Sequence, residues 1–120
     1  MAAPNLMAAT TLTEGSAGLA VTTSAATLVA NAAASGKVIR VKSVIFSNIH
    51  ATNTGTVTLQ VLKNGASTFR VAYQISVAIG TSFVPVSVEN IVHLEENDTL
   101  QALANAATTF EALASYDTVG

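Results

Sequence analysis

Apolar and polar residues alternate along most of the chain, which is the pattern of half-buried β-strands. The clearest case is a hairpin, in which two alternating runs, 56–61 and 69–77, flank Asn64-Gly65. This dipeptide readily supplies the two positive φ angles of a type I′ turn. We therefore expect the apolar residues of both strands to face one core. The residues expected to point inward are Val57, Leu59, Val61, Val71, Tyr73 and Ile75.

Further short runs with strand character follow at intervals of about 8–12 residues, and no segment carries a convincing helical period. They are expected at 19–23, 26–31, 38–48, 83–88, 91–94, 99–104 and 110–116. Pro85 lacks an N–H donor, so its strand should lie at a sheet edge or carry a bulge. The sequence thus predicts an all-β fold, a single antiparallel β-sandwich of about eight strands, either jelly-roll or immunoglobulin-like.

The expected strand at 38–48 changes character halfway along one face. Arg40 and Lys42 share this face with Val44 and Phe46 if the alternation continues without interruption. A β-bulge would explain the change by switching the direction of the side chains. Coverage by another chain would explain it equally well, and on that interpretation Val44 and Phe46 are candidate interface residues.

The first 17 residues show no periodicity and carry one charge, Glu14. We expect residues 1–17 to form an extended N-terminal arm and residues 18–120 to form the sandwich domain. A disordered tail is normally rich in charge and poor in large apolar groups, so this arm is expected to dock on a partner. Its candidate contact residues are Pro4, Leu6, Met7 and Leu12.

The charged fraction is the most informative part of the composition. Only 10% of residues are charged and 50% are hydrophobic, whereas ordinary soluble domains carry about 25% charged residues. Obligate interfaces are depleted in charge, so we favour a surface that is shared with copies of itself or with other proteins. The formal net charge of −2 argues against an electrostatic nucleic-acid partner.

No stretch has the length and apolarity of a membrane span, because polar residues interrupt the apolar region 19–38. Residues 1–13 lack the basic and apolar regions of a secretory signal. We therefore expect no membrane partner and expect folding in a cytosol. Cysteine is absent, so disulfides and thiolate metal sites are excluded.

The sequence offers little for catalysis or metal binding. Ser35-Gly36-Lys37 resembles part of a phosphate loop, but Asn31 and Val38 stand where that loop needs Gly and Ser or Thr. His50 and His93 are isolated from one another and have no partner at metal-ligand spacing. No Gly-x-Ser-x-Gly elbow is present either. We expect no enzymatic activity and no cofactor.

One acidic cluster deserves comparison with a calcium site. Glu95, Glu96 and Asp98 stand close together in the sequence, but their spacing is not that of a calcium loop, and calcium needs six or more oxygen ligands. The favoured interpretation is an acidic hairpin turn that resists edge pairing. Tryptophan is absent and only two tyrosines are present, so a sugar-binding module is the less favoured alternative.

Several motifs together resemble a known family. They are Met1-Ala2-Ala3-Pro4-Asn5, Ala34-Ser35-Gly36-Lys37-Val38, Leu94-Glu95-Glu96-Asn97-Asp98-Thr99-Leu100 and Ala114-Ser115-Tyr116. They resemble small virion structural proteins, of the capsid decoration type, from tailed phages that infect marine cyanobacteria and related bacteria. The resemblance implies a β-sandwich present in many copies on a particle that is assembled in the host cytoplasm. It brings no catalytic pattern.

Three functional hypotheses follow from these observations. The first is a capsid decoration or cement protein that binds the major capsid protein and stabilises the head lattice. The second is a tail, neck or fibre-base component of the same virion. The third, from another class, is a carbohydrate-binding module that recognises host-surface sugars.

Overall fold

The computed structural model describes residues 12–120, and these residues form nine β-strands. The strands are β1 (Leu12–Val21), β2 (Ala26–Ala30), β3 (Val38–Asn48), β4 (Gly55–Lys63), β5 (Ser67–Val77), β6 (Ser82–Val86), β7 (Val92–Leu94), β8 (Thr99–Ala104) and β9 (Phe110–Val119). No helix occurs within this described part of the chain. The prediction of an all-β fold is confirmed.

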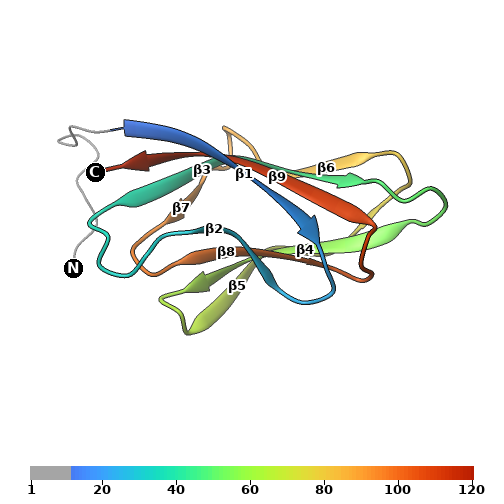
Figure 1. Cartoon of the computed structure of the whole chain (residues 1–120), viewed down its shortest axis with the longest axis horizontal. Helices are drawn as coiled ribbons and strands as arrows, with labels where there is room; N and C mark the ends of the chain where they lie inside the picture. Colours follow the sequence, from blue (N-terminus) through green and yellow to red (C-terminus); the bar gives the residue numbers. More distant parts are fainter. Residues whose placement is uncertain (1–11) are drawn as a thin grey trace.

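The strands form two antiparallel sheets that pack face to face (Figure 1). One sheet has the order β1-β9-β3-β6, with β7 also paired to β3, and the other has the order β2-β8-β4-β5. The first and last strands are neighbours, and β1 and β2 lie in different sheets. In an immunoglobulin sandwich the first two strands share a sheet. The strand order is therefore that of a jelly roll.

The core lies between the two sheets and is built by the inward positions of nearly every strand. The largest fully buried apolar side chains are Phe46, Phe110, Leu59, Leu94 and Leu100. They come from β3, β9, β4, β7 and β8, so both sheets contribute to one continuous apolar cluster. Burial of this cluster is the main force that holds the sheets together.

The β4–β5 hairpin forms as its turn residues predict. Asn64 and Gly65 have φ angles of 53° and 67°. The N–H of Ala66 donates to the carbonyl of Lys63 at 3.0 Å and closes the turn. Both central residues are left-handed, as a type I′ turn requires, so this local prediction is confirmed.

A β-bulge in β3 explains the change of character along that strand. The register with β9 shifts between Val41 and Ser43, which leaves Lys42 as the extra residue. Beyond the bulge, Val44 and Phe46 point inward and have no exposed surface. Of the two explanations the bulge is confirmed, and the assignment of Val44 and Phe46 to an interface is wrong.

Strand β1 begins earlier than the sequence pattern indicates. It pairs with β9 without a register shift from Leu12, opposite Val119, to Val21, opposite Phe110. Residues 12–17 therefore belong to the sandwich, and the prediction that the arm extends to residue 17 is wrong. The strand is rich in small residues, so its own alternation is weak and its pairing depends on β9. Pro4, Leu6 and Met7 lie outside the described residues.

Candidate interaction surfaces

Large apolar side chains are exposed along β5, although the alternation predicts them inside. Phe69, Val71, Tyr73 and Ile75 are 62%, 40%, 57% and 37% exposed, and we call these four residues the β5 surface. The facing residues of β4, Val57, Leu59 and Val61, are buried as predicted. The inward assignment is thus confirmed for β4. Val71, Tyr73 and Ile75 are exposed where burial was expected, although Ile75 lies opposite the inward Val57.

The position and the bulges of β5 explain this difference. The strand lies at the edge of its sheet. Its register with β4 shifts twice, between Val57 and Leu59 and again between Leu59 and Gln60. Each extra residue changes the side on which the next side chains point. As a result, the small side chain of Ala72 lies opposite Leu59 and is buried.

Replacing Tyr73 with serine should therefore have little effect on folding. The Tyr73 ring is mostly exposed, and surface substitutions of this kind change the free energy of unfolding by about 0.5 kcal/mol or less. If the Tyr73 ring pointed into the core, the same substitution would lower the free energy of unfolding by several kcal/mol. Urea unfolding followed by circular dichroism separates these results, with Leu59→Ala as a core control expected to lose about 2–5 kcal/mol.

A cation–π contact organises the middle of the β5 surface. The guanidinium carbon of Arg70 lies 5.2 Å from the centroid of the Tyr73 ring. Arg70 is also the single charged residue of this strand. Arginine and tyrosine are the residue types that most often dominate binding at protein interfaces. Together the two side chains place one positive charge beside an exposed apolar group.

The free edge of β5 is poorly suited to adding another strand. An unprotected edge strand invites pairing with a neighbouring chain, and bulges are one of the devices that prevent it. The two register shifts of β5 interrupt its regular hydrogen-bonding pattern, and Gln74 has a positive φ of 49°. The β5 surface therefore offers side chains, rather than a backbone template, to a partner.

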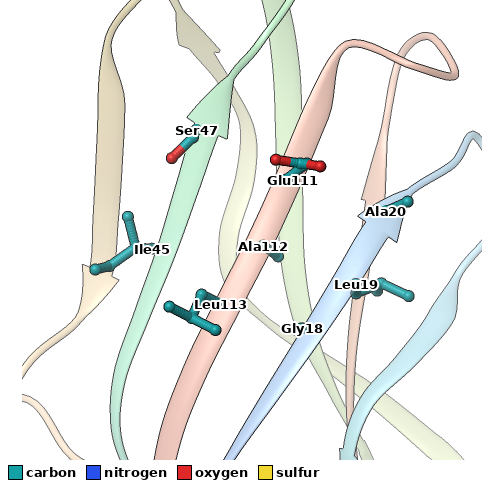
Figure 2. A pocket seen from close by; sticks show the side chains of 8 residues that line it. All are labelled: Gly18, Leu19, Ala20, Ile45, Ser47, Glu111, Ala112 and Leu113. Carbon is teal, nitrogen blue, oxygen red and sulfur yellow. The ribbon is translucent and has the colours of Figure 1, made fainter.

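A second candidate surface lies on the outer face of the other sheet. An open depression of about 490 Å³ crosses β1, β9 and β3, and we call it the outer depression (Figure 2). It is lined by Gly18, Leu19, Ala20, Ile45, Ser47, Glu111, Ala112 and Leu113. Small residues of β1 form one side, whereas Ile45 and Leu113 supply apolar surface on β3 and β9. Leu113 is 53% exposed.

The alternation along β9 indicates one part of this depression from the sequence. On β9 the residues Phe110, Ala112 and Ala114 are buried, so the alternate positions, Glu111 and Leu113, face outward. A leucine on the outer face of a strand is an exposed apolar group. The concave shape, in contrast, depends on Gly18, which the register brings opposite Leu113.

Charged residues gather at the other end of the same outer face. Arg40 and Lys42 reach Asp117 at 3.0 and 3.1 Å, and Lys42 also contacts Glu14 at 3.3 Å. The hydrogen bond to Asp117 is the main cause that raises the pKa of Lys42. The charges are thus paired within the chain, which makes this cluster structural.

The acidic turn between β7 and β8 is tied by hydrogen bonds to the β4–β5 hairpin. Asp98 is buried and accepts hydrogen bonds from Lys63 Nζ at 2.6 Å and from the N–H groups of Asn64 and Glu95, both at 2.9 Å. Burial by itself raises the pKa of Asp98, but these hydrogen bonds outweigh it and hold the pKa below its usual value. Asp98 thus connects the β7–β8 turn to the β4–β5 hairpin. Its oxygens serve hydrogen bonds within the chain, which gives the turn a structural role.

The other candidate chemistry also has structural explanations. His50 Nδ1 accepts hydrogen bonds from the N–H groups of Thr52 and Asn53, both at 3.1 Å, and so shapes the loop before β4. His93 lies on the short strand β7, opposite Arg40 of β3. Within residues 12–120, no group of three or more His, Asp or Glu side chains is placed to hold a metal ion.

The interface residues named from the sequence fall into three groups. Leu12 is 59% exposed at the first position of β1 and remains available to a partner. Val44 and Phe46 are core residues. Pro4, Leu6 and Met7 precede the described residues. Sequence reasoning missed the exposure of the β5 surface and the outer depression.

Comparison with known proteins gives a likeness of fold. No family model matches the chain, and no curated protein matches it. A subunit of the Bacillus endospore appendages, described as a novel family of disulfide-linked pili, is similar with a TM-score of 0.57 at 17% identity. That similarity covers 99% of this chain and 96% of the other. It supports the sandwich architecture.

A pentameric capsid protein isolated from metagenomic phage sequences is similar at a lower level. Its TM-score is 0.45 at 18% identity, and the similarity covers 85% of this chain and 58% of that chain.

The described part of this chain holds no helix long and apolar enough to cross a membrane.

Proposed function

We propose that this protein is a non-enzymatic structural subunit of a tailed phage particle, acting as a capsid decoration or cement protein that binds the head lattice. The observation that carries the proposal is the β5 surface. Four large apolar side chains are exposed on one edge strand of a chain in which only 10% of residues are charged. Clusters of exposed large apolar side chains typically mark a site of protein association.

The best-buried acidic residues of the described chain have structural roles. Asp98 and Asp117 are buried and paired with lysine or arginine side chains, so neither is free for acid–base catalysis. The motifs at 1–5, 34–38, 94–100 and 114–116 resemble those of phage virion proteins. The partner would be the major capsid protein or another virion protein, together with copies of this chain.

Quantitative mass spectrometry of gradient-purified phage particles tests the proposal. A copy number close to that of the major capsid protein is the result expected for a decoration protein. A copy number close to that of the portal or tail proteins would instead assign the protein to the neck, tail or fibre base of the particle. Absence from purified particles, with the chain present in the infected cell, would overturn the virion assignment altogether.

A further inference from the structure

We propose that a second copy of this chain inserts Arg70 and Tyr73 of its β5 into the outer depression, so that copies join head to tail. The two surfaces belong to different sheets and are accessible on the same molecule. The inference concerns contact between copies and stands whether or not a phage particle carries the chain.

The two surfaces are complementary in shape and polarity. Tyr73 and Val71 project from an edge strand, whereas the depression is open and is bordered by Ile45 and Leu113. Gly18 has no side chain, and a Cβ added at this position would meet no atom within 4 Å, so the space above the β1 backbone is open. An aromatic ring can therefore lie against the β1 backbone. Tyrosine beside arginine in an apolar recess is a typical anchor of a protein interface.

The charges are also complementary. Arg70 is the single charge of β5, and Glu111 is the single charge that lines the depression. Among residues 12–120 neither side chain takes part in a salt bridge. Opposite charges that meet across an interface steer the partners and set their register. Arg70 lies over the Tyr73 ring, so insertion of the ring would carry the guanidinium into the depression that Glu111 lines.

The occupant must be another molecule. The depression is on the outer face of the sheet that contains β1, β9 and β3, and β5 is the edge strand of the opposite sheet. The two sheets lie on opposite sides of the molecule (Figure 1), and the apolar core is packed between them. A contact between different surfaces of identical chains is heterologous, so it produces a ring or an open filament and not a two-fold dimer.

Charge reversal in the purified full chain gives the sharpest test. The unmodified chain should self-associate as its concentration rises in sedimentation velocity runs at low salt. Arg70→Glu and Glu111→Arg should each weaken association about tenfold or more, because each variant opposes like charges at every contact. A mixture of the two variants should associate again, since the Arg70 of one then meets the Glu111 of the other. The double variant should also recover association.

A neutral substitution tests the depression itself. A Cβ added at Gly18 would meet no atom within 4 Å, so Gly18→Leu should extend into the recess, abolish association and leave the circular dichroism spectrum unchanged. Ala33→Leu is the matched control, because it adds the same side chain at an exposed position in the β2–β3 loop, which lies outside the depression. This variant should associate as the unmodified chain does.

Three outcomes would overturn the inference. They are an unmodified chain that stays monomeric at every concentration, single variants that associate normally, and a mixture that fails to recover. Each is read from the purified protein alone. Failure here is therefore distinguishable from failure of the virion assignment, which is measured on particles.

Discussion

Replacing Phe46 with alanine should lower the free energy of unfolding by about 3–5 kcal/mol, the usual cost of truncating a buried phenylalanine. The Phe46 side chain has no exposed surface and lies in the core cluster. Its removal loses the burial of a large ring and leaves a cavity between the sheets. Small domains have a total stability of about 5–15 kcal/mol, so the loss is large. Urea unfolding monitored by circular dichroism measures it.

The neighbouring residue supplies the matched control. Ile45 lies on the outer face of the same strand, where it lines the depression and is partly exposed. Ile45→Ala should cost about 1 kcal/mol, because less apolar area leaves water. If Phe46→Ala were as mild as Ile45→Ala, the bulge at Lys42 would be misplaced. Phe46 would then return to the outer face, where an interface role is possible.

Replacing Asp98 with asparagine should cost about 2–4 kcal/mol, because a buried acceptor shared by three donors is lost. The carboxylate accepts from Lys63 Nζ and from two backbone N–H groups. An asparagine amide has one acceptor oxygen and would turn its NH₂ group toward another donor. Equilibrium unfolding at neutral pH measures the loss.

A second acidic residue of the same turn provides the control. Glu95 Oε1 lies 3.6 Å from Lys63 Nζ, and its side chain is 64% exposed. Exposed ion pairs contribute about 0–1 kcal/mol, so Glu95→Gln should change stability within that range. Equal effects of Glu95→Gln and Asp98→Asn would show that the turn is held by surface charge and not by the buried carboxylate.

The pH dependence of stability provides an independent check on Asp98. Its pKa is lower in the folded chain than in the unfolded chain, so the folded state binds the proton more weakly. The stabilisation is complete above the ordinary aspartate pKa of about 4 and is lost as the pH falls through the folded pKa. The stability advantage of the unmodified chain over Asp98→Asn should therefore shrink below about pH 4. An advantage that is unchanged at low pH would contradict the lowered pKa.

The contacts of this turn also bear on assembly. Asp98 binds the Asn64 N–H, and the hairpin turn at Asn64-Gly65 leads directly into β5. The hydrogen bonds of Asp98 therefore hold one end of the strand that carries the proposed contact residues Arg70 and Tyr73. Loosening the turn should disturb self-association as well as stability, whereas Gly18→Leu should disturb association alone.

The local features of this fold could be predicted from the sequence. Alternation in 57–61, the Asn64-Gly65 turn and the proline in the strand at 83–88 depend on neighbours in the chain. The structure confirms the buried face of β4, the left-handed turn and an edge position with a register shift for β6. A side chain's direction follows from a period of two as long as the strand is regular.

The direction and the exposure of side chains that follow a bulge could not be predicted from the sequence, because a bulge is defined only by pairing with the partner strand. The extra residue at Lys42 turns Val44 and Phe46 inward. In β5, with its two extra residues, Tyr73 is exposed although the adjacent Ala72 is buried. Likewise, β1 forms because β9 lies beside it along ten residues.

The candidate site was decided by tertiary structure for the same reason. Gly18, Ile45 and Leu113 come from three strands that are far apart in the sequence, and only the order β1-β9-β3 places them around one depression. The sequence by itself determined an all-β chain with little charge and much apolar surface to cover. Strand order then decided where that surface lies, because an edge strand has no neighbour to bury its side chains.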